Sequence, residues 1–153
     1  MRRRAVLLAL VVGLGACGGG GDDDATDATA EPAPCDLLRP GDVPDGLVAL
    51  DLESADAAVA CIYAPPGTEA GEEPASVAAI QVEHGRYDEP GDLDGLGEDV
   101  GGIGRAAIVE TEETGFTVLV LVEDDTSFGL VLRGDDVTRA DAVALATVVV
   151  ARF

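Results

Sequence analysis

The chain has 153 residues, which is enough for one domain of ordinary size with a single core. Its nine basic residues are all arginine and stand against 30 acidic residues, so the net charge at pH 7 is −21. Such a charge repels phosphate groups, and aromatic residues, on which bases could stack, make up 3% of the chain. The composition therefore excludes nucleic acid as a partner.

Residues 1–16 have the organisation of a signal peptide. Arginines at positions 2–4 form a positive segment, and an apolar segment follows at 5–14. This segment of about ten residues is shorter than the ~20 that a membrane-spanning helix needs. We therefore expect an export signal rather than a spanning helix.

The end of this leader, Leu14-Gly15-Ala16-Cys17, resembles the bacterial lipobox, in which small residues precede a cysteine that is lipidated and becomes the new N-terminus. The resemblance implies that Cys17 carries a diacylglycerol and palmitate. Two or more acyl chains give stable anchoring. We expect a lipoprotein of the cell envelope, held on the extracytoplasmic face of the cell membrane by its N-terminal lipid.

Residues 17–34 are rich in glycine, aspartate and proline and lack bulky apolar side chains, which predicts a flexible acidic tether. Two aspartate clusters were compared with the calcium loop of EF-hands. Starting at Asp22, the third ligand position is Thr26 and the glycine position is Asp27; starting at Asp92, the third ligand position is Leu96. Neither cluster fits, and we expect no metal site and no cofactor.

Two further cysteines, Cys35 and Cys61, lie in the remaining chain. Thiols of an exported protein oxidise, so one disulfide between them is the natural pairing. The loop-entropy account gives such a bond roughly 3 to 4 kcal/mol of stabilisation. The sequence has no Cys-x-x-Cys pair and no histidine near these cysteines, so neither a redox centre nor a zinc site is supported.

Five segments have the composition or the alternation of β-strands: 58–63, 76–84, 106–112, 116–123 and 127–133. The fourth carries apolar residues on both faces, which is typical of a central strand. Asp124 and Asp125 predict a tight hairpin turn after it. Between 85 and 104 the chain is rich in glycine and aspartate, and we expect a long loop with room for one helical turn.

Helices are expected near both ends of the domain 35–153. Residues 36–43 predict a short helical or turn segment, which Pro44 and Gly46 end. Capping residues at 136–141 precede an alanine-rich segment at 142–152, which predicts a buried helix. The order of elements indicates an α+β fold, with an antiparallel sheet of about five strands packed against an N-terminal short helix and a C-terminal helix.

Several motifs together resemble a family of actinobacterial cell-envelope lipoproteins whose domain is of unknown function. They are PCDLLRPGDV, then ACIYA, GIGRAA and a terminal AVALATVVVARF, and they span 34–153. The resemblance implies a disulfide between Cys35 and Cys61 and backbone close approach at Gly102, Gly104 and Ala107. Pro44 and Gly46 depart from the longer first helix of the family. The family supplies no established chemistry.

The residues that could carry chemistry form no catalytic pattern. His84 is the sole histidine, and none of the serines, Ser54, Ser76 and Ser127, lies in a Gly-x-Ser-x-Gly motif. The GIGRAA segment lacks the third glycine of a dinucleotide loop and precedes a strand. Carboxylate pairs such as Glu112-Glu113 and Asp135-Asp136 are too abundant to be informative. We therefore expect no catalytic residues.

Two hypotheses follow. The first is a non-catalytic domain that binds an envelope protein, a peptide or a small ligand through a sheet face or the loop 85–104. The alternative is an enzyme, either a carboxylate-based hydrolase or a metal-dependent envelope enzyme. A concave pocket lined by His84 and converging carboxylates would favour the enzyme, and a filled core with shallow clefts would favour the binding domain.

Overall fold

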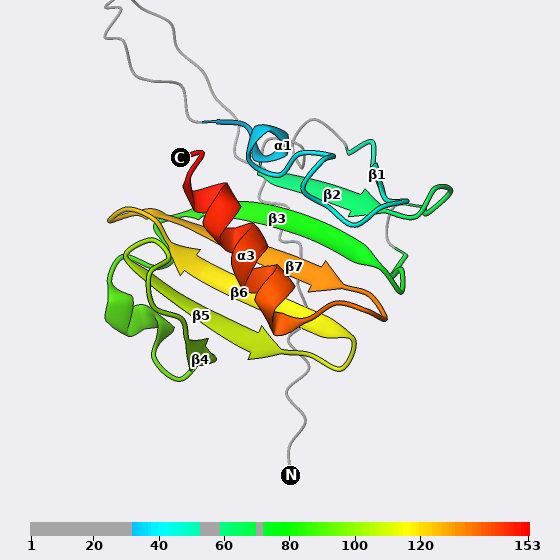
Figure 1. The fold of residues 1–153 in the computed structure, drawn as a ribbon. Helices are drawn as coiled ribbons and strands as arrows, with labels where there is room; N and C mark the ends of the chain where they lie inside the picture. The colour runs from blue at the N-terminus through cyan, green and yellow to red at the C-terminus, as the bar shows by residue number, and fades with distance from the viewer. Residues whose placement is uncertain (1–31, 53–58, 70–71) are drawn as a thin grey trace, which may run out of the picture.

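One antiparallel sheet dominates the fold of this computed structural model, which describes residues 32–52, 59–69 and 72–153. The strand order is β1-β2-β3-β7-β6-β5-β4, and every neighbouring pair is antiparallel (Figure 1). The strands are β1 Val48–Ala49, β2 Ala60–Ala64, β3 Val77–His84, β4 Glu98–Asp99, β5 Ala106–Thr111, β6 Gly115–Leu121 and β7 Thr126–Arg133.

The sheet has seven strands, so the prediction of about five was wrong. The five predicted segments correspond to β2, β3, β5, β6 and β7, with ends that coincide or are shifted by at most two residues; Ala58 lies outside the described residues. The two additional strands, β1 and β4, have two residues each and form the two edges. Two residues are too few to show an alternation, and Glu98 and Asp99 disfavour strands. Very short edge strands, and charged side chains such as those of β4, are a known protection against edge-to-edge pairing.

In the described part of the chain, three helical segments accompany the sheet: α1 Pro34–Leu37, the 3-10 helix η1 Pro90–Leu93 and α3 Arg139–Val150. The predicted segment 36–43 is therefore one helical turn that begins two residues earlier and continues as turns. η1 is the helical turn allowed for in the loop 85–104. α3 begins three residues before its predicted start, because Thr138 forms a capping box with Asp141.

The core lies between the sheet and the two α-helices. α3 crosses one face of the sheet, and α1 lies beside β2 on the same side (Figure 1). The buried cluster there combines Leu37 and Leu38 with the inward side chains of β2, β3, β5, β6 and β7 and with Leu145 and Val149 of α3. Leu93 packs on Ile108 and Leu121 on the opposite face, so β6 is covered on both sides as predicted for the fourth segment.

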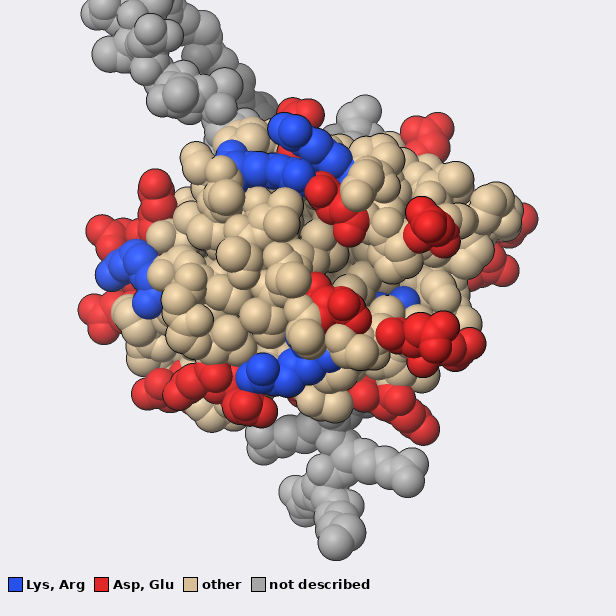
Figure 2. Space-filling model, viewed as in Figure 1, with Lys and Arg blue, Asp and Glu red and all other residues tan. Residues whose placement is uncertain are grey.

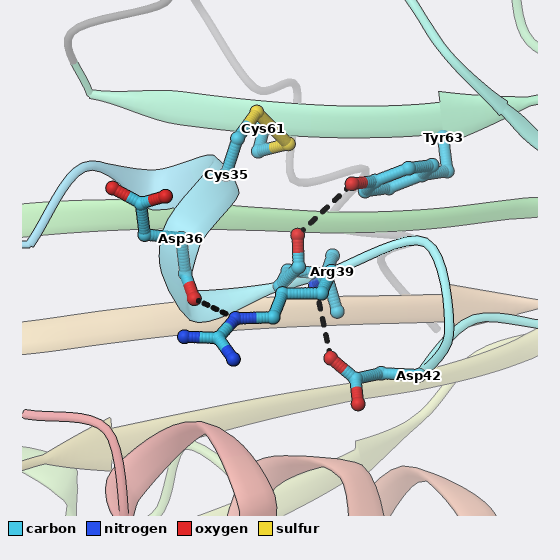
Figure 3. The surroundings of a disulfide bond; sticks show 7 residues. Cys35, Asp36, Arg39, Asp42, Cys61 and Tyr63 are labelled. Atoms are coloured by element: carbon cyan, nitrogen blue, oxygen red, sulfur yellow. Dashed lines mark hydrogen bonds between the residues drawn. A yellow bond between two sulfur atoms is a disulfide. The ribbon is translucent and has the colours of Figure 1, made fainter.

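The predicted disulfide is confirmed, because Cys35 of α1 and Cys61 of β2 are bonded, with their Cα atoms 5.1 Å apart. Beside this bond the Tyr63 hydroxyl donates to the carbonyl oxygen of Leu38 at 3.1 Å (Figure 3). The disulfide holds α1 against β2, and the hydrogen bond holds the residue that follows α1. One covalent bond and one buried hydrogen bond thus connect two segments that are about 25 residues apart in the sequence.

The last residues of the chain are held against α1 (Figure 1). The Arg152 guanidinium donates to the carbonyl oxygen of Leu37 at 2.5 Å and makes two bonds to the Asp42 carboxylate, at 2.5 and 2.9 Å. This pairing holds the pKa of Asp42 below its ordinary value, chiefly through the hydrogen bond from Arg152. Arg152 thus links the last residues of the chain to α1 and to the turn that follows it.

Gly104 is a position of close backbone approach, as the family resemblance implies. Its φ is +54°, and a Cβ there would lie 2.5 Å from the carbonyl oxygen of Leu121. Gly102 also has a positive φ, of 83°, but a Cβ would meet nothing within 4 Å. Ala107 is buried in the core. The close approach therefore applies at Gly104 and is not found at Gly102.

Candidate functional site

The residues singled out for anchoring lie beyond the described part of the chain. Cys17 and the aspartates at 22–27 are among the residues that the structure does not describe, and so is Ser54. The second aspartate cluster is described, and it forms a turn. The Asp92 carboxylate accepts bonds from the backbone N–H groups of Asp88 and Glu89, at 2.8 and 3.0 Å, as part of the capping box of η1.

His84 lies at the end of β3, where it contacts β7. Its Nδ1 is 3.4 Å from the Thr126 hydroxyl oxygen. The same hydroxyl donates to a carboxylate oxygen of Asp125 at 3.2 Å. Ser127 donates to the carbonyl oxygen of Glu83 at 3.4 Å. The His84–Thr126 and Ser127–Glu83 contacts therefore join the end of β3 to the start of β7, and the Asp125 carboxylate contacts its neighbour Thr126.

The carboxylates that make close contacts have structural partners. Glu112 accepts two bonds from Arg133, at 2.9 and 2.5 Å, and one from Thr117. Asp141 accepts from the Thr138 backbone and hydroxyl, which lowers its pKa. Within the described ranges, no group of three or more His, Cys, Asp or Glu side chains is placed to hold a metal ion.

An acidic groove of about 470 Å³ opens where the end of β7, the start of α3 and the segment 44–47 meet. Its apolar lining includes Leu47, Leu132 and Val137. Four aspartates also line it: Asp45, Asp135, Asp136 and Asp141. Arg133 is the basic residue of the lining, and its charge is compensated by Glu112, which is not part of the groove. The groove therefore carries an excess of negative charge.

A second, shallower hollow lies at the β6–β7 hairpin, among Arg105 and residues 122–125. Arg105 pairs there with Asp124. His84 lines neither this hollow nor the acidic groove. Neither depression therefore combines His84 with converging carboxylates.

The solvent-facing side of α3 is the least expected surface of the molecule. We define the α3 face by the uncharged exposed residues of the helix and its C-cap, which are Ala140, Ala144, Thr147, Val148 and Ala151; Asp141 is also exposed and lies at the N-terminal edge of this face. They recur at helical spacing on one side, while Ala142, Leu145, Ala146 and Val149 are buried on the other. No charged residue occurs between Asp141 and Arg152. The Thr147 hydroxyl donates to the Val143 carbonyl at 2.9 Å, so even this polar group is bonded within the helix.

Figure 2, drawn from the side that carries α3, shows this arrangement directly. The area left of the middle of the view is free of charged side chains, whereas acidic side chains lie just right of the centre and along the rim. Val148 is 40% exposed, although a quarter of the residues in this chain are charged and could occupy such a position. An uncharged apolar area surrounded by polar residues is the usual form of an interaction surface.

The α3 face corrects one sequence-based expectation. The alanine-rich segment with its spacing of Val143, Ala146 and Val150, preceded by capping residues, predicts a buried helix. The structure buries one side and leaves the other exposed. The signal that could have identified the face was the absence of charge over the ten residues between Asp141 and Arg152. The expectation of a buried helix was wrong for the outer half of the helix.

Comparison with known proteins adds no relatives: no protein-family model matches the chain, and neither a curated protein nor a solved structure is significantly similar to it. Among the described residues, no helix has both the length and the apolar character needed to cross a membrane.

Proposed function

We propose that the protein is a lipoprotein of the cell envelope whose folded domain binds a partner and does not catalyse a reaction. Residues 1–16 are its signal peptide, Cys17 its lipidation site, and 17–34 its tether. Residues 35–153 form an α+β domain in which a short first helix and the last helix pack on one sheet. The leader, the lipobox-like end and the polar tether support the anchoring, and the motifs of the envelope lipoprotein family agree with it.

The tether positions the domain near the membrane. A flexible chain of the length of 17–34 spans roughly 20 to 25 Å on average. It ends at α1, and α1 contacts the C-terminal end of α3 through the bond from Arg152 to Leu37. The acidic domain is repelled by anionic lipid headgroups, which favours a separation from the bilayer. The α3 face then remains available to other molecules of the envelope.

The observation that carries the binding function is the α3 face itself. A surface helix normally presents charged or polar residues to water. This chain has acidic residues in excess, yet after Asp141 it places alanine, threonine and valine on the exposed side of α3. Exposed apolar area is unfavourable by about 25 cal/mol per Å² relative to its burial. A partner that covers the face would remove this unfavourable exposure.

Photo-crosslinking in intact cells tests this function. A photoreactive amino acid replaces Val148 on the α3 face, and in a matched control it replaces Val48 on β1, which is 45% exposed against 40% for Val148. We expect a defined adduct from position 148 and none from position 48. If illumination gives no adduct at 148, the domain has no partner on this face and the proposed function is wrong.

A further inference from the structure

We propose that the partner of the α3 face is a protein segment with an apolar stripe flanked by lysine or arginine residues. This inference rests on the proposed binding function and specifies the chemistry of the partner. Three features support it: the shape of the α3 face, the acidic groove beside it, and the ion pairs that the surrounding arginines already form.

The shape of the α3 face suits another helix. Ala140, Ala144 and Ala151 project little from the helix surface, and Val148 is the bulkiest member of the face. Helices pack with axes about 8 to 10 Å apart, at the short end where the contacting side chains are small. A partner helix with an apolar stripe can therefore approach closely and bury the Val148 side chain.

The acidic groove adjoins the N-terminal end of the face. Asp141, in the first turn of α3, lines the groove directly after Ala140 of the face. The groove combines apolar lining residues with four aspartates. A long basic side chain matches both features, because its methylene groups can lie on apolar surface while its charge reaches a carboxylate. The groove and the face thus complement a segment that is apolar and then basic.

The arginines around this surface are already engaged. Arg139, at the start of α3, pairs with Glu98 at 2.8 Å, and Arg152, just after its end, pairs with Asp42. Arg133, in the groove, pairs with Glu112. The charge left to attract a partner is therefore negative. This selects a cationic partner and disfavours anionic lipid and a second copy of this acidic chain, because like charges repel.

Binding of designed peptides tests the inference. The full-length lipidated protein in zwitterionic nanodiscs is titrated with two synthetic helical peptides of identical apolar stripe, one flanked by lysines and one by glutamates, with empty nanodiscs as reference. We expect the lysine-flanked peptide to bind at least about tenfold more tightly, and this preference to weaken with salt. Equal binding of the two peptides overturns the inference.

Two matched variants locate the contact. Val148→Glu places a charge on the α3 face, and Val48→Glu places the same charge at an equally exposed position on β1. Both add negative charge, so a purely electrostatic attraction to the lysine-flanked peptide would be kept or strengthened. We expect Val148→Glu to weaken binding about tenfold or more, through loss of the buried valine, and Val48→Glu to leave it unchanged. Equal effects of the two variants overturn the inference.

The remaining outcomes separate this inference from the function on which it rests. If sedimentation shows that the chain dimerises and that Val148→Glu abolishes the dimer, the occupant is a second copy and the inference is wrong. An adduct at position 148 in cells, with no preference for the lysine-flanked peptide, contradicts the partner chemistry but leaves the binding function intact. The absence of that adduct contradicts the function itself.

Discussion

At the scale of single residues, the region around the disulfide depends on one buried hydroxyl. Tyr63 is almost fully buried, and its hydroxyl satisfies the carbonyl oxygen of Leu38. Tyr63→Phe keeps the ring and leaves that carbonyl without its donor, so we expect the free energy of unfolding to fall by about 1 to 3 kcal/mol. Guanidinium denaturation of the two proteins measures the difference. An unchanged midpoint would mean that water replaces the hydroxyl.

The Asp42–Arg152 pair predicts a dependence of stability on pH. The pKa of Asp42 is lowered in the folded state, chiefly by the hydrogen bond from Arg152. Its contribution is therefore complete above the ordinary pKa of 3.8 and is lost as the pH falls through the lowered value. We expect Asp42→Asn to be less stable at pH 7, by about 1.5 to 3 kcal/mol for the charge-assisted bonds.

Thermal unfolding between pH 7 and pH 2 measures this dependence. The difference between wild type and Asp42→Asn should narrow below pH 4, as Asp42 of the wild type becomes protonated. A constant difference across this range would contradict the assignment to Asp42.

Residue-scale contacts differ in how well sequence predicts them. The pairing of Cys35 with Cys61 could be predicted, because no other cysteine remains once Cys17 is assigned to lipidation. The pairing of Asp42 with Arg152 could not, because the two lie 110 positions apart and acidic candidates for Arg152 are abundant. Nor could the role of Asp92 as a capping residue of η1, which depends on backbone geometry.

At the scale of elements, α3 has two sides with different roles. Leu145 is 6% exposed in the core, whereas Val148 is 40% exposed on the α3 face. We expect Leu145→Ala to cost about 2 to 5 kcal/mol of folding free energy, because it leaves a cavity. Val148→Ala should cost within about 0.5 kcal/mol, as is usual at a surface. Chemical denaturation of both variants tests this; comparable losses would show that the outer side also serves the fold.

The elements also show where sequence patterns succeed. β2, β3, β5, β6 and β7 have five residues or more, which is enough for an alternation or an apolar run to be visible. β1 and β4 owe their pairing to the strands beside them and have no signal of their own. For α3, the spacing of apolar residues and the capping residues predicted a helix. A segment of alanine and valine does not show which side of that helix is exposed.

At the scale of the whole molecule, the first prediction concerns the attachment of lipid to Cys17. Cells that express the wild type or Cys17→Ser are labelled with a radioactive fatty acid and separated by detergent phase partition. The wild type should carry the label and enter the detergent phase, because acyl chains confer that partition. Cys17→Ser should do neither. A labelled Cys17→Ser protein would show that the lipid is attached elsewhere.

Net charge acts on the same scale. A charge of −21 keeps copies of the chain apart and steers cationic molecules toward it. The α3 face adds an uncharged area to this acidic surface (Figure 2). Solubility alone explains the acidic residues, but it does not explain the α3 face. A surface that attracts cationic molecules broadly and also offers an apolar contact is suited to selective binding.

The central claim, that the anchored domain binds a partner through the α3 face, is tested most directly by thermal unfolding in cells. A bound partner stabilises the folded state by mass action. The wild type and Val48→Glu should therefore unfold at a higher temperature in intact cells than after purification, and Val148→Glu should lose this difference. If Val148→Glu retains the full difference, or if the wild type shows none, the α3 face does not bind a partner in the envelope.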